Sequence, residues 1–316
     1  MKFGVVGLGN HALNRIMPAI LESKNEVSAL TTQNEEKGLK LSEQYKCVYS
    51  KTLNDMLSED IDAVYVGSPN YLHYEHARKS LMKDKHVLME KQMTLRSSEA
   101  KELISIANER KLKIGVGFHL RFQSGLEFVR KELEDEGPFV INGRWCHESS
   151  HATPTEESKW WTENEKVGGG SIMGTGVHVI DTIVSLFGKF PRKITAFRTP
   201  DQRIIDDTMM VNMQFEKGFG SAFSSREVKP VANDLNVLTK SENILCRNFF
   251  STGSPVTIFV NGEKVEEIPP INPYVQEISG FKEYVFGNPS KIATGNDGYR
   301  VVRIVEDSQK FISMVR

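Results

Sequence analysis

Residues 2–12 have the sequence Lys-Phe-Gly-Val-Val-Gly-Leu-Gly-Asn-His-Ala, and they set the architecture of the N-terminal half of the chain. The apolar run Lys2–Gly7 is typical of a buried strand, and the apolar spacing over Leu13–Leu21 predicts a helix after it. The chain contains several Gly-x-Gly triplets. Only this one combines a strand before it, a helix after it and a small residue at the third offset. The stretch therefore predicts a dinucleotide-binding turn.

Each small residue of the turn has a physical task. Gly7 permits a tight turn, Gly9 lets the backbone approach a pyrophosphate, and Ala12 lets the helix pack closely on the strand. The free N–H groups at the start of the helix complete an anion site. We expect Gly7, Gly9, Asn10 and Ala12 to contact NAD or NADP.

The end of the second predicted strand, Val27–Thr31, bears on the choice between the two cofactors. NAD-binding folds of this kind usually place an acidic residue there, which hydrogen-bonds the ribose 2′-hydroxyl. Here Thr31 and Thr32 occupy the position, and the first carboxylate is Glu35. The missing acid removes a repulsion against a 2′-phosphate, so the sequence leans slightly to NADP and leaves NAD open.

Strands and helices alternate up to about residue 120 and then give way to strands. The alternation predicts an α/β fold that begins with a Rossmann doubly wound parallel sheet. The later strands predict an α+β domain with a large, mostly antiparallel open sheet, in which Thr208–Arg226 forms a hairpin. We expect a dinucleotide-binding domain over residues 1–120 and a domain for substrate binding and oligomerisation over residues 121–316.

A second glycine-rich stretch, Gly168–Gly188, predicts a buried helix with one polar stripe. Positions three and four apart share a helix face, so Gly174, His178, Asp181 and Ser185 lie together. A His and an Asp on an otherwise apolar helix form either a mutually satisfied buried pair or a catalytic pair. The helix alone leaves both readings open.

Composition excludes several classes of protein. With 40 basic and 41 acidic residues among 316, the net charge is −1, so no basic field recruits nucleic acid or an anionic membrane. No stretch has the continuous apolar sequence of a membrane span, and the N-terminus lacks the pattern of a signal peptide. The three cysteines are widely spaced, which argues against a disulfide framework or a zinc site and favours a cytoplasmic location. We expect no metal site.

Several motifs are in the order and spacing of one known family. They are Gly7–Ala12, Ser68-Pro69-Asn70 with His73, His86–Lys91, Gly117-Phe118 with Arg121-Phe122, Gly168-Gly169-Gly170, Gly176-Val177-His178 with Asp181, and Gly295–Ser308. Together they resemble the Gfo/Idh/MocA family of NAD(P)-dependent oxidoreductases, over nearly the whole chain.

The resemblance implies a reaction and assigns residues to it. It implies hydride transfer between NAD(P) and a carbinol or carbonyl carbon of a sugar, cyclitol or sugar derivative. Lys91 and His178 would be the acid/base groups, and Asp181 would position the substrate or orient His178. Further cofactor contacts would come from the loops after two strands, through Ser68, Asn70, His73, Glu90 and Lys91 itself.

The chain departs from the family pattern at two positions. Gly174 replaces an acidic residue one turn before His178, and Gln92 replaces a proline after Lys91. Because a cis bond before a residue other than proline costs about 3 kcal/mol, we expect Lys91–Gln92 to be trans. The departures leave an alternative open, a catalytically inactive dinucleotide-binding sensor or interaction protein.

Three tryptophans and the open sheet suggest further roles. Trp145, Trp160 and Trp161 form either a wall for sugar stacking or part of the core. His147 and His151 have no suitably spaced carboxylates, which argues against a metal there. The resemblance implies that the open sheet mediates a homodimer or homotetramer.

Overall fold

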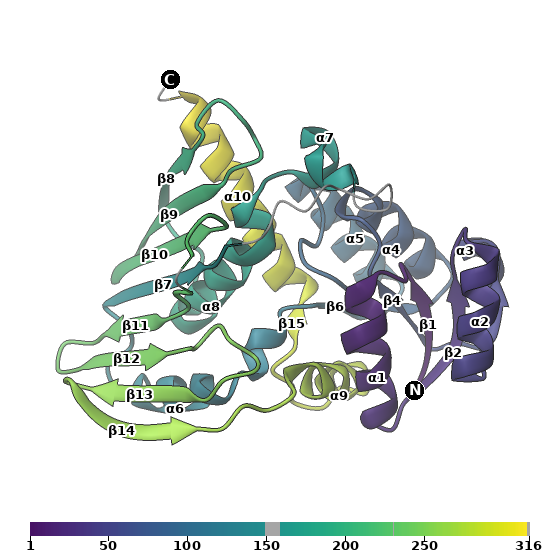
Figure 1. Ribbon diagram of the computed structural model, residues 1–316, viewed down its shortest axis with the longest axis horizontal. Coiled ribbons are helices and arrows are strands. Elements are labelled where there is room, and N and C mark those ends of the chain that lie inside the picture. Colours follow the sequence, from purple (N-terminus) through teal and green to yellow (C-terminus); the bar gives the residue numbers. More distant parts are fainter. Residues whose placement is uncertain (149–158, 230, 315–316) are drawn as a thin grey trace. The chain divides into compact units, whose positions relative to one another are not determined.

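The computed structural model describes residues 1–148, 159–229 and 231–314 (Figure 1). The chain divides into two compact units. The first contains Met1–His119 and Tyr274–Val302, and the second contains Leu120–Pro273 and Arg303–Arg316. The chain therefore leaves the first unit near residue 120 and returns to it at Tyr274, whereas the domain limits expected from the sequence, 1–120 and 121–316, stay a prediction.

The first unit is a seven-stranded sheet in the order β15-β6-β5-β4-β1-β2-β3. All neighbouring strands are parallel except β15, which pairs antiparallel with β6. The strands are β1 (Lys2–Val6), β2 (Glu26–Thr31), β3 (Val48–Ser50), β4 (Ala63–Val66), β5 (His86–Met89), β6 (Ile114–Val116) and β15 (Ala293–Thr294). The predicted Rossmann sheet is confirmed.

Helices follow the strands of this sheet, and several have identifiable ends. Asn34 caps α2, where its side chain accepts a hydrogen bond from the Lys37 N–H. Phe281 of α9 packs so closely on the sheet that a Cβ at Gly115 would lie 2.7 Å from its ring. The helical segments are η1 (Ala12–Ile16), α1 (Met17–Glu22), α2 (Glu35–Tyr45), α3 (Leu53–Met56), η2 (Asn70–Leu72), α4 (His73–Met82), α5 (Ser97–Glu109), α9 (Pro273–Val285) and α10 (Gly295–Met314), whose last residues belong to the second unit.

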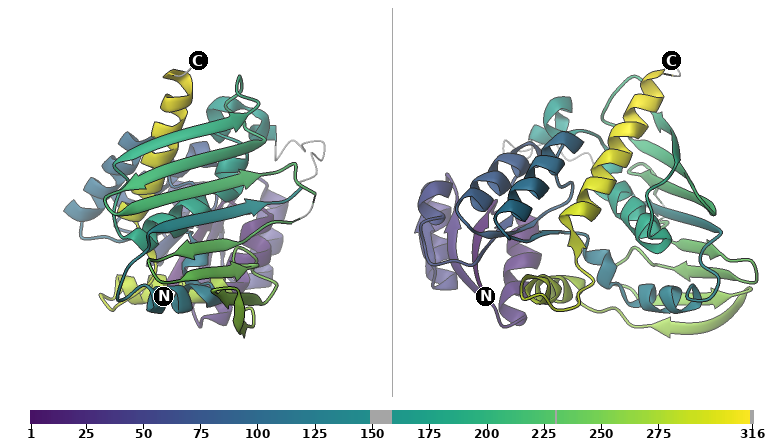
Figure 2. Two further views of the ribbon diagram at one scale, coloured as in Figure 1. Left: turned by 90° about the vertical axis from the view of Figure 1, so that its left-hand side faces the viewer. Right: turned by 180° about the vertical axis from the view of Figure 1, so that it is seen from behind.

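The second unit is an eight-stranded sheet in the order β14-β13-β12-β11-β7-β10-β9-β8, seen from its broad side in the left view of Figure 2. Only the pair β7–β10 is parallel. The predicted mostly antiparallel sheet, including the β9–β10 hairpin, is therefore confirmed. The strands are β7 (Val140–Cys146), β8 (Lys193–Thr199), β9 (Thr208–Phe215), β10 (Gly218–Ser225), β11 (Leu235–Leu238), β12 (Asn243–Arg247), β13 (Val256–Val260) and β14 (Glu263–Ile268).

One face of this sheet is covered by α8 (Val177–Phe187), which continues from the π-helical turn η5 (Ile172–Gly176). Val179 and Ile183 lie over Gly143 and Gly220, where any added Cβ would meet them at 2.5 Å. Gly188 ends the helix in the left-handed region, at φ +66°. The other helical segments of this unit are η3 (His119–Phe122), whose first residue belongs to the first unit, α6 (Ser124–Glu132), η4 (Lys159–Thr162) and α7 (Asn164–Val167).

The start of this helix depends on the buried side chain of Asp206. Its carboxylate accepts hydrogen bonds from the backbone N–H groups of Gly170 and Ile172, at 2.7 and 3.0 Å, and from the Ser171 hydroxyl. A Cβ at Gly170 would lie 1.8 Å from the Asp206 carbonyl oxygen. The glycines at the start of the stretch are thus explained by close backbone approach.

The same region corrects one expectation from composition. By length and composition, Glu165–Phe187 could cross a membrane, although no such stretch was expected. In its most apolar window of 18 residues, 72% is buried inside the protein, and a mostly buried core helix meets the same criteria of length and composition.

Candidate functional site

The glycine turn after β1 has the predicted backbone. Gly7 has φ +90°, and a Cβ there would lie 2.2 Å from the backbone nitrogen of Ser68, so only glycine fits. A Cβ at Gly9 would meet nothing within 4 Å, which leaves open space over the turn for a ligand. Ala12 is buried at the start of η1, and Asn10 is exposed. The turn can therefore cradle a pyrophosphate.

The residues at the end of β2 lie where the adenosine ribose of a dinucleotide is bound in such sheets. Thr31 is buried, and the Thr32 hydroxyl accepts a hydrogen bond from the Asn34 N–H at 3.2 Å. The hydroxyl of Tyr49 donates to the Thr32 carbonyl oxygen at 3.1 Å. The local backbone is thus well held and presents no carboxylate before α2.

The loop after β4 is tied to the segment after β5 through His73. The two ring nitrogens of His73 lie 2.7 Å from the carbonyl oxygens of Ser68 and Gln92. Asn70 is buried in the same loop, and the Ser68 hydroxyl lies 3.0 Å from Nδ1 of His76. His73 therefore has a scaffold role, and it need not touch the cofactor.

Glu90, directly after β5, contacts two other side chains of this unit. Its Oε1 accepts a hydrogen bond from the Tyr65 hydroxyl at 2.9 Å and lies 3.1 Å from Nε2 of His11. Burial raises the pKa of Glu90, but the nearby His11, Lys91 and Tyr65 outweigh it and lower the pKa to about 2. Its Oε2 has no hydrogen-bond partner among the described residues, so an ionised acceptor remains open to a ligand.

Lys91 follows Glu90 and corrects one prediction. The Lys91–Gln92 peptide bond is cis, and the expectation of a trans bond was wrong. Gln92 is held in place, because it is buried and its carbonyl oxygen is hydrogen-bonded to the ring of His73. Burial lowers the pKa of the Lys91 amine, and the neighbouring Glu90 only partly opposes this. A lysine with a lowered pKa suits proton transfer.

In the second unit, His178 lies buried on α8, with the ring of Trp145 beside it at a centroid distance of 5.4 Å. Trp145 also stacks on Phe250 at 5.9 Å. The predicted pairing of Lys91 with His178 joins residues of different units and stays a prediction.

Asp181 is engaged by a residue whose role the sequence left undefined. Arg121 donates two hydrogen bonds to the Asp181 carboxylate, from Nε at 2.9 Å and from a terminal nitrogen at 2.7 Å. Their side chains are only 10% and 3% exposed. Asp181, on α8, thus fixes the guanidinium of Arg121. This contact favours a positioning role for Asp181 over proton transfer.

Gly174 lies one turn before His178, within η5. A Cβ added there would meet nothing within 4 Å. The space expected beside a missing side chain therefore exists, within a π-helical turn of a kind that is frequent at functional sites.

Of the remaining predicted tryptophans, Trp160 is half-buried and Trp161 is exposed. Trp160 and Trp161 stack on each other at 4.3 Å, and Trp161 is 41% exposed. His151 lies outside the described residues. Among the described residues, no group of three or more His, Cys, Asp or Glu side chains could hold a metal.

Three residues described above had no assigned role in the sequence analysis: His11 and Tyr274 in the first unit, and Arg121 in the second. The ring of Tyr274, at the start of α9, lies 5.4 Å from that of His11 and 4.6 Å from that of His119. His11 could have been found from its position inside the glycine turn. Tyr274 could not, because it lies more than 150 residues further along the chain.

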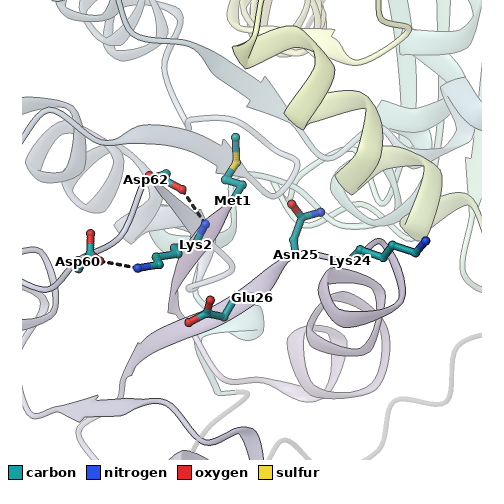
Figure 3. A pocket seen from close by; sticks show the side chains of 7 residues that line it. All are labelled: Met1, Lys2, Lys24, Asn25, Glu26, Asp60 and Asp62. Atoms are coloured by element: carbon teal, nitrogen blue, oxygen red, sulfur yellow. Dashed lines mark hydrogen bonds and ion pairs between the residues drawn. The ribbon is translucent and has the colours of Figure 1, made fainter.

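A polar depression of about 500 Å³ lies at the opposite edge of the first sheet (Figure 3). The N–H of Lys2 donates to Asp62 at 2.7 Å, and its side chain pairs with Asp60. The lining residues precede or begin β1, β2 and β4, whereas parallel sheets bind ligands at the carboxyl ends of their strands. The depression is thus distinct from the predicted cofactor edge.

Comparison with known proteins identifies the family of both parts of the chain. Residues 1–118 match the model of an oxidoreductase family with an NAD-binding Rossmann fold. Residues 138–238 match the GFO/IDH/MocA C-terminal domain. The chain belongs to the GFO/IDH/MocA oxidoreductase family. The resemblance found in the sequence is thereby confirmed, together with a dinucleotide-binding first domain.

Individual members of the GFO/IDH/MocA family are distant relatives. The chain is 26% identical over 308 residues to 1,5-anhydro-D-fructose reductase of Ensifer adhaerens, covering 94% of this chain and 92% of the relative. It is 31% identical over 136 residues to scyllo-inositol 2-dehydrogenase (NADP(+)) IolW of Bacillus subtilis, covering 43% and 37%. Aldose-aldose oxidoreductase from Caulobacter crescentus has a similar fold, with a TM-score of 0.87, 23% identity and coverage of 100% and 98%.

Proposed function

We propose that the protein is an NAD(P)-dependent dehydrogenase or reductase that acts on a CH–OH group of a sugar, cyclitol or sugar derivative. The observation that carries the proposal is the carboxyl edge of the first sheet. There an open turn at Gly9 is followed by an ionised Glu90 with a vacant oxygen and by a desolvated Lys91. These groups fit a dinucleotide beside a reacting alcohol.

The residues of the first unit would hold the cofactor and move one proton. The N–H groups around Gly9 would bind the pyrophosphate, and Oε2 of Glu90 would accept a hydrogen bond from a ribose hydroxyl. When bound, NAD(P) supplies the site that accepts or donates the hydride. Because burial lowers the pKa of Lys91, its Nζ can take the hydroxyl proton during oxidation and return it during reduction.

His178 of the second unit is the other proposed acid/base group. The Trp145 ring beside it excludes water from one side and offers an apolar face to a sugar ring. Asp181 would act indirectly, because both of its carboxylate oxygens are engaged by Arg121. We therefore assign proton transfer to Lys91 and His178 and a positioning role to Asp181.

The test is turnover with NADP⁺ and NAD⁺ on a panel of sugars and cyclitols, followed by nicotinamide absorbance. We expect Lys91→Ala and His178→Asn each to lower kcat by about 100-fold or more. The exposed Lys83 provides a matched control, and Lys83→Ala should retain full turnover. Unchanged turnover in Lys91→Ala would disprove its assigned role.

The proposed preference for NADP rests on Thr31 and Thr32. In Thr32→Asp, the new carboxylate can still accept the Asn34 N–H and adds a charge that repels a 2′-phosphate. We expect kcat/KM for NADP⁺ to fall at least tenfold relative to that for NAD⁺. The neutral control Thr32→Asn should leave the ratio unchanged. A wild type that prefers NAD⁺ would contradict the preference.

A non-catalytic dinucleotide sensor is the second candidate, and Gly174 is the observation that favours it. The position beside His178 has no acid and has open space. The sensor predicts tight cofactor binding with no hydride transfer to any compound of the panel, whereas robust turnover of one compound excludes it. The open space favours a substrate larger than the simplest monosaccharides.

We also propose that the protein forms a homodimer or homotetramer in the cytoplasm, through the uncovered face of the second sheet. Phe197 and Phe219 are 58% and 53% exposed on β8 and β10. Phe219 precedes Gly220, which faces α8, so its side chain points to the uncovered face. Sedimentation should show an oligomer that Phe219→Glu dissociates and that Phe286→Glu, at an exposed position in the turn after α9, leaves intact. A monomeric wild type would refute this.

A further inference from the structure

His11 has a side chain placed for ligand binding that the reaction described above does not use. It belongs to the glycine turn, its side chain is 42% exposed, and its Nε2 lies 3.1 Å from Oε1 of Glu90. We propose that His11 joins Glu90, already assigned to a ribose hydroxyl above, in binding the ribose of the nicotinamide nucleotide. The inference deepens the proposed function, because it rests on dinucleotide binding at this edge.

The order of the strands places His11 on the nicotinamide side of the turn. Strand β1 lies between β2 and β4, and a dinucleotide crosses such a sheet at this point, with its adenosine over the end of β2. The other nucleotide then extends toward the ends of β4 and β5. His11 points in that direction, since it contacts Glu90 after β5 and Tyr274 of α9.

The hydrogen-bonding chemistry matches a ribose diol. Glu90 is ionised and can only accept hydrogen bonds, so the hydrogen between it and His11 is donated by Nε2. Nδ1 of His11 and Oε2 of Glu90 have no hydrogen-bond partners among the residues that the structure describes. Two neighbouring side chains thus each offer an unused polar atom, and the vicinal ribose hydroxyls can donate to Oε2 of Glu90 and pair with Nδ1 of His11.

The surrounding rings hold His11 ready for this contact. Tyr274 lies against His11 at an interplanar angle of 73° and against His119 at 34°. Burial lowers the pKa of His119 to about 3, so this ring is neutral near pH 7 and adds no charge beside the ribose. The turn at Gly9 leaves space on the ligand side. A side chain fixed in this way loses little conformational freedom when the ribose binds.

Three ligands test the inference by calorimetry without any substrate: ADP, ADP-ribose and NADPH. Only the last two carry the second ribose. In His11→Phe, which keeps a ring against Tyr274, we expect affinity for ADP-ribose and NADPH to fall about tenfold and that for ADP to change less than twofold. Equal weakening of all three ligands, or of none, would overturn the inference.

Controls separate this result from misfolding and from failure of the proposed reaction. His86→Phe alters a histidine at the opposite end of β5 and should leave all three affinities unchanged. If His11→Phe does not fold, His11→Gln, which keeps polar atoms, serves in its place and should show a smaller loss for the same two ligands. A wild type that binds NADPH but oxidises no sugar refutes the dehydrogenase and leaves the inference on His11 intact.

Discussion

Replacing Asp181 by asparagine should destabilise the second unit without removing a proton carrier. Arg121 donates to both carboxylate oxygens of Asp181, and neither side chain has appreciable access to water. Removing one partner of a buried ion pair leaves an uncompensated charge, which typically costs about 3–5 kcal/mol. Arg130 adds a second positive charge nearby. Burial lowers the pKa of Arg130, and the positive charge of Arg121 lowers it further. Asparagine keeps the shape and one acceptor, so we expect a loss of about 3 kcal/mol, at the lower end of that range.

The tryptophans provide a local assay for this loss. All three tryptophans of the chain, Trp145, Trp160 and Trp161, belong to the second unit, so their fluorescence reports its unfolding alone. With a urea dependence of about 1–3 kcal/mol per molar, a loss of about 3 kcal/mol moves the midpoint down by at least about 1 M. The double variant Arg121→Met with Asp181→Leu replaces both charges by apolar side chains and should recover most of the stability.

Kinetics distinguish the positioning role from proton transfer. A positioning residue predicts that Asp181→Asn retains turnover at temperatures where it is folded, with an unchanged pH profile. A proton carrier predicts the reverse, a large loss of kcat with a midpoint close to that of the wild type. A midpoint shift below about 0.3 M would refute the reasoning, since it would mean that Arg121 does not depend on this carboxylate.

Two further predictions concern the backbone and the titration of one acid. Gly170→Ala places a Cβ 1.8 Å from a backbone oxygen and should lower the free energy of unfolding by about 3 kcal/mol or more, as measured by tryptophan fluorescence. In Gly174→Ala the new Cβ enters open space, so the variant should be as stable as the wild type or slightly more stable. For Glu90, the pKa in the folded protein is about 2, lower than the 4.5 of an unperturbed glutamate. Its contribution to stability is therefore present above about pH 4.5 and disappears as the pH falls through 2. The expected loss in the free energy of unfolding is about 3 kcal/mol. Urea unfolding followed by circular dichroism should find this loss in the wild type and not in Glu90→Gln.

The parts of the fold that sequence reasoning predicted are those with a strong local pattern. Both sheets and the long helices have continuous apolar runs or helical spacing, and Gly7 has a backbone requirement that few residues meet. Among the elements that were missed, three illustrate the physical reasons. Val48–Ser50 has only three residues, Ser124–Glu132 is a short surface helix, and Glu263–Ile268 is a charged, exposed edge strand. None of them carries an apolar periodicity long enough to detect.

Side-chain partners were harder to predict than elements, because they come from distant parts of the chain. Asp181 was recognised as a site residue, but its partner Arg121 lies 60 residues earlier and was known only as part of a motif. The cis bond at Lys91–Gln92 was missed for the same reason. Its surroundings include the ring of His73, 19 residues away, which no argument from the dipeptide alone includes.

These contacts change which residues decide between an enzyme and a sensor. The sequence placed two doubtful positions on one helix, a glycine where an acid was expected and an aspartate of uncertain role. Asp181 is bound on both oxygens by Arg121, and Gly174 has no side chain to offer. An acidic side chain introduced at position 174 would therefore add a new group to the proton-transfer network. It would not replace a contact that Asp181 lacks. Activity then depends on Lys91 and His178, so turnover by these two residues, and not position 174 alone, decides between the enzyme and the sensor.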